Sequence, residues 1–221
     1  MKLLVIAIAL AACARADDGY RLWLRYDPVA DPALRQEYAQ HFTEIVCPAA
    51  VAGRGRPTSA MQAAVAELER GARGMLGAAV PVVPAPDRDG AIVLIGNQGD
   101  RLRDGYALRS VARGHRAILI SSGRDAGVLY GAFALLRRMQ LGESLRDLNT
   151  GSMPRYARRI IDHWDNLDGT IERGYAGRSL WKWSELPGQI DPRYVDYARA
   201  EASIGVNGTV LNNVNADARI L

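Results

Sequence analysis

The sequence predicts an α/β protein in which a layered N-terminal domain of mixed strands and helices is followed by the start of a parallel β/α unit. Strand-like runs alternate with helical stripes over residues 20–141, which is typical of layers packed on one core. Beyond a polar stretch at 142–154, the order strand, loop, helix, strand occurs once. A hydrophobic content of 48% over 221 residues is enough for such a core. We therefore expect one domain over 17–150 and a second, truncated one over 151–221, because a single β/α unit cannot bury its own faces.

The first element is expected to be a strand and the second a helix. Residues 20–26, YRLWLRY, alternate with the period of a strand that buries one face. Asp31 has the position of a helix N-cap and Pro32 that of a first helical residue, so a helix is predicted to about residue 46. The Gly and Pro residues at 53–57 indicate a turn.

A longer helix and two strands follow. The helix is capped by Thr58 or Ser59 and extends to about residue 76, with an apolar stripe at helical spacing. The stripe is expected to lie in the core and comprises Met61, Val65, Leu68, Ala72 and Met75. A short strand is expected within 81–86, and residues 91–95, AIVLI, predict a buried strand.

The end of the first domain predicts a hairpin and a helix. Strand-like runs at 106–112 and 116–121 are joined by residues 113–115, which is typical of a hairpin turn. Residues 126–141 then have the apolar spacing of a helix.

The second unit begins with a strand at 159–161. After a long loop, Asp191 and Pro192 predict the start of a helix that Gly205 terminates. Four residues of this helix are expected to face inward, namely Tyr194, Tyr197, Ala198 and Ile204. Residues 206–214, VNGTVLNNV, predict a second strand parallel to the first.

The charge pattern argues against nucleic-acid binding. Lys and Arg total 28 against 24 Asp and Glu, which gives a formal net charge of +4. Lys2 and Lys182 are the only lysines, and the arginines are scattered along the chain. A nucleic-acid binder usually gathers its basic residues on one face, so we expect a solvated, arginine-rich surface instead.

The N-terminus has the pattern of a targeting segment, residues 1–16. An apolar run at 3–12 precedes Ala14-Arg15-Ala16, which matches a signal-peptide cleavage site. The run is shorter than the roughly 20 residues that span a bilayer. Leu10-Ala11-Ala12-Cys13 equally matches a lipobox, in which Cys13 would be lipidated. Both interpretations predict an extracytoplasmic protein, either periplasmic or secreted, or an outer-membrane lipoprotein that meets the membrane only through Cys13.

Neither a disulfide nor a metal site is expected. Cys47 is predicted to be a buried, inert thiol, and the other cysteine lies in the targeting segment. No two of the three histidines (His41, His115 and His163) are three or four residues apart, which argues against zinc. Residues 95–100, IGNQGD, lack the spacing of a phosphate-binding loop and predict a surface turn.

The most informative stretch is the loop at 163–177, HWDNLDGTIERGYAG, directly after a predicted strand. Enzymes built on parallel sheets place substrate contacts in such loops. Paired carboxylates could serve acid–base chemistry, but carboxylates beside glycines more often cap the loop's own amides, and we favour that role. The carboxylates concerned are Asp162, Asp165, Asp168 and Glu172.

Indoles and amides in and after this loop indicate a polar ligand with ring faces, such as a sugar. On the residues alone, Trp164 has two open roles, stacking on a sugar or packing in the core. Trp181 and Trp183 are expected to pack in the core or an interface. Amides that flank Val214 are costly to bury without partners, which a sugar or a neighbouring loop could supply. They are Asn212, Asn213 and Asn215.

Two blocks carry a family resemblance. HWDNLDGTIERGYAGRSLW at 163–181 and SIGVNGTVLNNVNA at 203–216 closely resemble the α-glucuronidases of glycoside hydrolase family 67. YRLWLRY at 20–26 and GVLYGAFALLRRMQ at 127–140 are similar to that family's N-terminal domain. The resemblance implies an N-terminal α/β domain followed by a (β/α)8 TIM barrel, of which this chain would hold the first two strands. It also implies removal of α-1,2-linked glucuronic acid or its 4-O-methyl ether from xylooligosaccharides, with inversion and without a cofactor.

The resemblance also assigns substrate-binding residues. Trp164 matches the family's uronic-acid-stacking tryptophan, and Val214 matches a residue near the 4-position of the sugar. Asn213, Asn166 and Asp165 would support the pocket. The family's catalytic acid, its basic carboxylates and its uronate-binding Lys and Arg residues lie on later barrel strands. We therefore expect no catalytic residue in this chain and no activity from it alone.

The expected partners are glucuronoxylan-derived oligosaccharides, and a homodimer is a further expectation for the full-length enzyme. The alternative function is that of a non-catalytic carbohydrate-binding remnant that kept the sugar-stacking loop.

Overall fold

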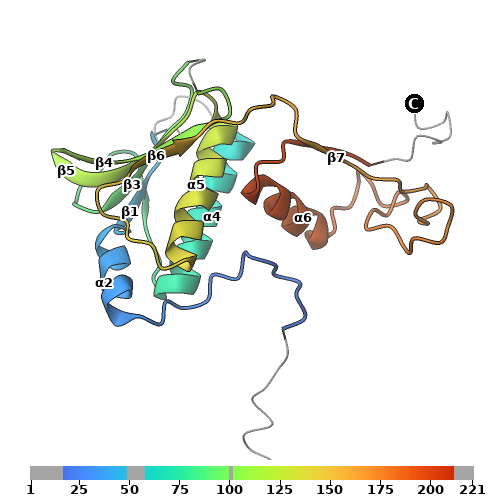
Figure 1. Ribbon diagram of the computed structural model, residues 1–221, viewed down its shortest axis with the longest axis horizontal. Helices are drawn as coiled ribbons and strands as arrows, with labels where there is room; N and C mark the ends of the chain where they lie inside the picture. The colour runs from blue at the N-terminus through green and yellow to red at the C-terminus, as the bar shows by residue number, and fades with distance from the viewer. Residues whose placement is uncertain (1–16, 49–57, 100–101, 212–221) are drawn as a thin grey trace, which may run out of the picture.

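The computed structural model describes residues 17–48, 58–99 and 102–211 (Figure 1). The predicted turn at 53–57 and the end of the predicted strand beyond residue 211 lie outside these ranges. No helix among the described residues is long and apolar enough to cross a membrane.

A six-stranded mixed sheet forms the first layer, in the order β2-β1-β3-β5-β4-β6. The four strands β2, β1, β3 and β5 are parallel, while β4 runs antiparallel to both β5 and β6. The strands are β1 Glu44–Val46, β2 Val82–Val83, β3 Ala91–Ile95, β4 Tyr106–Arg113, β5 His115–Ser121 and β6 Asn149–Ser152. The predicted hairpin, the buried strand at 91–95 and the short strand within 81–86 are confirmed.

Helices α4 (Ser59–Leu76) and α5 (Asp125–Gln140) lie side by side against one face of this sheet, and α2 (Pro32–Gln40) packs near their ends (Figure 1). The main core fills the space between them. Strand residues of one face, Ile45, Ile92 and Ile118, are neighbours in register and meet the stripe of α4 there. The predicted stripe is confirmed, with Leu68, Ala72 and Met75 fully buried.

Two predicted elements are wrong. Residues 20–26 do not form a strand: 20–23 form a turn and 24–26 have no regular structure. Leu22 and Tyr26 adopt left-handed φ angles of 51°, and Leu22 N donates to Gly19 O at 3.0 Å. The helix predicted to residue 46 ends at Gln40. Residues 44–46 form β1 instead, because that segment is hydrogen-bonded between β2 and β3, so tertiary pairing overrides the helical pattern.

The expected linker at 142–154 contains β6, which extends the first sheet at its edge. Its sequence, NTGS, is polar and exposed at all four positions, so it shows no alternation. The sheet thus continues to Ser152, two residues past the predicted boundary at 150.

The second unit consists of β7 (Ile160–Asp162), α6 (Pro192–Ser203) and β8 (Gly208–Val210), with β7 and β8 parallel as predicted. Asp191 caps α6 by accepting from Arg193 N at 2.9 Å. Tyr194 is buried, but Ala198 and Ile204 are exposed, which corrects the predicted inward face. Among the described elements, α6 packs mainly against α5, and the positions Ala198 and Ile204 are left open to solvent.

The N-terminal segment 17–26 and α4 tie α6 to the first domain. Tyr20 Oη donates to Asp196 Oδ2 at 3.0 Å, and Trp23 Nε1 donates to Ser203 Oγ at 2.7 Å. Both bonds end on α6, at Asp196 and Ser203. The segment therefore serves as a strap across α6.

Candidate functional site

The loop that follows β7 lies at the end of the molecule far from the six-stranded sheet (Figure 1). His163 N donates to Val210 O at 2.8 Å, which continues the β7–β8 ladder by one bond into the loop. The loop therefore starts at the carboxyl end of a parallel strand, which is the edge where ligands bind in such sheets.

Trp164 presents its indole to solvent. Its side chain is 45% exposed, while its backbone is fixed because its carbonyl oxygen accepts from Glu172 N at 2.8 Å. A neighbouring apolar residue, Leu167, is 40% exposed. A half-exposed indole on a fixed backbone is available for stacking and is not part of the core.

A cluster of rings lies beneath the loop. His163 Nε2 is 2.6 Å from Tyr197 Oη, and Trp181 packs edge-on against both rings with centroid distances of 5.6 and 5.4 Å. Trp181 also meets Tyr194, at 4.8 Å, and is only 7% exposed. The prediction that Trp181 packs in the core or an interface is thus confirmed.

Asp165 joins this cluster from the loop. It is 4% exposed, its Oδ2 accepts from Ser179 Oγ, and its Oδ1 is 3.6 Å from His163 Nδ1. Ser179 Oγ in turn accepts from Trp181 N at 2.9 Å. Burial, and then the nearby carboxylate of Glu201, raise the pKa of Tyr197, so its phenol stays protonated. The contacts of His163 and Asp165 hold the backbone on both sides of Trp164 in place.

Two further polar side chains of the loop, Asn166 and Asp168, bind other groups of the same loop. Asn166 Nδ2 donates to Thr170 Oγ1 at 2.9 Å and to Glu172 O at 2.8 Å. Asp168 accepts from Thr170 N and Oγ1 at 2.9 and 2.6 Å, and these hydrogen bonds lower the pKa of Asp168. The interpretation of loop carboxylates as backbone caps is confirmed for Asp168. Direct sugar contacts of Asp165 and Asn166 stay predictions.

The remaining candidates fall elsewhere. Asn212, Asn213, Val214 and Asn215 lie outside the described residues. Cys47 is buried as predicted. Within the three described ranges, no group of three or more His, Cys, Asp or Glu side chains is placed to hold a metal ion.

The ring cluster is the feature that sequence reasoning missed. Tyr197 is 34 residues from His163, so their contact could not be inferred from local spacing. The available signal was the i,i+3 pair Tyr194 and Tyr197, which places both rings on one side of α6.

Comparison with known proteins gives the context of this geometry. Curated relatives include an α-glucuronidase A of Emericella nidulans, 33% identical over 240 residues, which cover 99% of this chain and 27% of the relative. A probable α-glucuronidase A of Aspergillus terreus is 31% identical over 238 residues, which cover 100% of this chain and 27% of that protein. The chain therefore spans about a quarter of the length of these relatives.

Solved structures share the fold at low identity. A family GH115 4-O-methyl-α-glucuronidase with specificity for decorated arabinogalactans superposes with a TM-score of 0.51 at 12% identity, over 76% of this chain and 25% of that one. A GH138 enzyme targeting pectin rhamnogalacturonan II gives a TM-score of 0.50 at 14% identity, over 76% and 24%. These likenesses show a common α/β architecture.

Family models account for most of the chain. The model of the glycosyl hydrolase family 67 N-terminus matches residues 22–135, which include the six-stranded sheet up to the end of β5 and most of α5. The model of the family's middle domain matches residues 138–221, which include the loop with Trp164. The chain therefore belongs to glycoside hydrolase family 67.

Proposed function

We propose that this chain is part of an extracytoplasmic α-glucuronidase and forms one wall of its sugar pocket. The reaction is removal of α-1,2-linked glucuronic acid, or its 4-O-methyl ether, from xylooligosaccharides with inversion. Family membership and the relatives named α-glucuronidase support this proposal. The targeting pattern at 1–16 supports the location outside the cytoplasm.

The observation that carries the proposal is the exposed indole of Trp164 at the carboxyl end of β7. The C–H face of a pyranose stacks on the face of an indole. The indole of Trp164 is already half exposed, so the protein need not rearrange to make this contact. The contacts of Asp165 and Glu172 with their neighbours fix the backbone on both sides of the ring, so little ordering entropy is lost on binding.

The parallel pair β7–β8 is consistent with the start of a (β/α)8 barrel. Its residues Ile160, Ile161 and Val210 are 50, 36 and 40% exposed, which is unusual for apolar residues of a parallel pair. We propose that further strands and helices of the family fold cover these faces. The catalytic carboxylates of the proposed activity would come from those strands, because Asp165 and Asp168 are occupied within the loop.

Titration with 4-O-methylglucuronosyl xylotriose tests the binding role of Trp164. We expect the ligand to quench the tryptophan fluorescence of the purified chain, and Trp164→Ala to weaken binding about tenfold or more, which corresponds to about 1.4 kcal/mol. Leu167→Ala, at a similarly exposed position of the same loop, is the matched control and should bind normally. Equal binding by Trp164→Ala and the unmodified chain would refute the stacking role.

The same mixtures test where the chemistry lies. We expect the chain to bind the oligosaccharide without releasing uronic acid over hours, as measured by chromatography of the products. Release above a protein-free blank would show that carboxylates of this chain suffice for hydrolysis. Binding of unbranched xylotriose with equal strength would argue against recognition of the uronic acid.

A further inference from the structure

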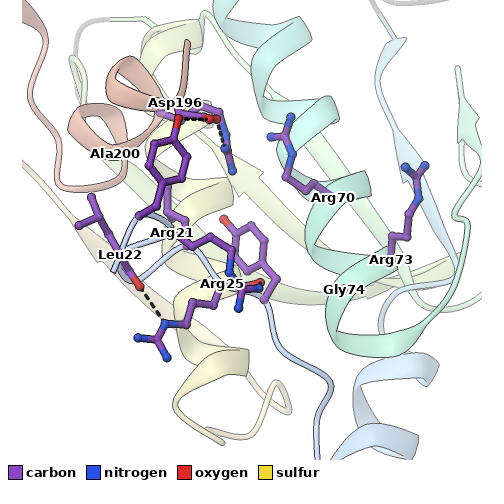
Figure 2. Close-up of a pocket in the computed structure, with 12 residues that line it drawn as sticks. Arg21, Leu22, Arg25, Arg70, Arg73, Gly74, Asp196 and Ala200 are labelled. Atoms are coloured by element: carbon purple, nitrogen blue, oxygen red, sulfur yellow. Dashed lines mark hydrogen bonds and ion pairs between the residues drawn. The ribbon is translucent and has the colours of Figure 1, made fainter. Parts of the chain in front are cut away.

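A pocket lies between the strap, α4 and α6, and no residue of the loop at 163–177 lines it (Figure 2). Its volume is about 350 Å³, enough for one or two sugar rings. Three segments that are far apart in sequence meet there, so the pocket exists only when α6 is docked on the first domain.

Arginine dominates the lining. Arg70 and Arg73 project from one face of α4, and Arg21 and Arg25 belong to the strap (Figure 2). Arg199 comes from α6. Five guanidinium groups and one carboxylate, Asp196, line the pocket, and Asp196 is bound to Tyr20 and Arg199. The lining therefore carries an excess of positive charge, although the arginines of the chain as a whole are scattered.

The floor of the pocket is rigid. Glu67 is buried beneath it and accepts from Tyr26 Oη at 2.7 Å and from Arg199 at 2.8 and 2.9 Å. Gly74 lets the strap approach α4 closely, because a Cβ atom there would lie 2.4 Å from Tyr26 O. A ligand would therefore meet a wall that is already ordered.

Arg73 carries the positive charge of the rim that no carboxylate of the described residues neutralises. The other rim arginines are paired, Arg21 with Asp27, Arg25 with Asp17, and Arg70 with Glu67. Arg73 forms no side-chain hydrogen bond or ion pair with any residue in the described ranges. Since the side chains of Arg21, Arg25 and Arg70 are 45–56% exposed, several of their N–H groups also face solvent. An anion in the pocket would gain these donors without breaking the buried floor.

We propose that this pocket binds the carboxylate of a uronic-acid unit, at a site separate from the wall formed by Trp164. The planar fork of arginine matches a carboxylate. Leu22, Leu24 and the ring of Tyr20 supply apolar surface for the C–H face of the sugar. The choice of a uronate among anions rests on the proposed function, whereas the preference for an anion rests on the arginines alone. Such a site would hold a second uronic-acid-bearing unit of the same polysaccharide.

The test is a titration of the ¹⁵N-labelled chain with sodium D-glucuronate, followed by amide NMR shifts. We expect shifts in the strap and in α4 around Arg73, with a dissociation constant on the order of 1 mM. The variant Arg73→Gln should weaken this binding about tenfold without unfolding the protein, because Arg73 has no partner to lose. Arg73→Lys should bind with intermediate strength. Arg109→Gln, which removes an exposed arginine from β4, is the matched control.

The two sites fail independently in this experiment. Trp164→Ala should abolish shifts in the loop at 163–177 and leave those of the pocket. If the loop responds and the pocket does not, this inference is refuted and the proposed function stands. If Arg73→Gln binds glucuronate as tightly as the unmodified chain, or if inorganic phosphate binds as tightly as glucuronate, a uronate site is likewise refuted. Xylose should produce no shift in the pocket, and equal binding of this neutral sugar would contradict a role for charge.

Discussion

Replacing Trp181 with alanine is expected to destabilise the second unit by about 3–5 kcal/mol, the usual loss for a large buried aromatic side chain. Trp181 is 7% exposed and contacts the rings of His163, Tyr194 and Tyr197, so its removal leaves a cavity bounded by three rings. Urea unfolding followed by far-ultraviolet circular dichroism measures the loss.

The matched control is Trp183→Ala, two residues along the same loop. Trp183 is only partly buried and forms none of the ring contacts of the cluster, so its replacement should cost clearly less. Hydrogen exchange adds a local readout, because amides of the loop at 163–177 should lose protection in Trp181→Ala. Equal losses for the two variants would mean that the cluster does not hold the loop.

Local signals in the sequence were sufficient for several element boundaries. Asp31 was predicted as a cap, Thr58 or Ser59 as another, and Asp191 as the start of a helix. Asp31, Thr58 and Asp191 each accept a hydrogen bond from a backbone amide two or three residues later. A cap is formed within one turn, so tertiary structure rarely changes it. The hairpin at 106–121 was predictable for the same reason, since its two strands pair through a tight turn.

Elements that depend on distant partners were not predictable. The apolar and polar residues of 20–26 do alternate, but the aromatic side chains of this segment bind α6 and Glu67. All of these partners are more than forty residues away in the sequence. Residues 44–46 continue a helical pattern and yet pair with β2 and β3. Nothing in the composition of NTGS distinguishes β6 from a loop.

The candidate site was partly predictable. Composition pointed to the loop, and the resemblance selected Trp164 within it, at a position that is half exposed. Composition alone could not separate Asp165, buried against Ser179, from Asp168, which caps an exposed turn. That difference depends on residues 178–197, which fold back under the loop.

Replacing Arg199 with alanine is expected to cost about 3 kcal/mol, at the low end of the range for breaking a buried ion pair. Arg199 on α6 gives Glu67 on α4 two hydrogen bonds, and their side chains are 19 and 2% exposed. Tyr26 and Arg70 remain as partners of Glu67, which limits the loss. The four tryptophans all lie in the strap or in the second unit, so fluorescence in urea reports the undocking of α6.

The control on the same helix is Arg193→Ala, because Arg193 is half exposed and faces Asp191 at 3.6 Å. Arg193→Ala should lower the free energy of unfolding by much less than Arg199→Ala. Similar losses for the two variants would mean that the pair with Glu67 does not hold α6.

The pH dependence of this loss distinguishes an ion pair from simple packing. Burial opposes ionisation of Glu67, but hydrogen bonds from Arg199 and Tyr26 outweigh it and lower the pKa of that carboxyl. A lowered pKa stabilises the fold above the ordinary value of about 4.3, and this contribution is lost as the pH falls through the folded value. In Arg199→Ala, fewer hydrogen bonds offset the cost of burying the ionised Glu67 carboxylate. Protonation of Glu67 should therefore remove part of that cost in the variant. The difference between the unmodified chain and Arg199→Ala should therefore shrink from pH 7 to pH 3, whereas a loss of packing alone would leave it constant.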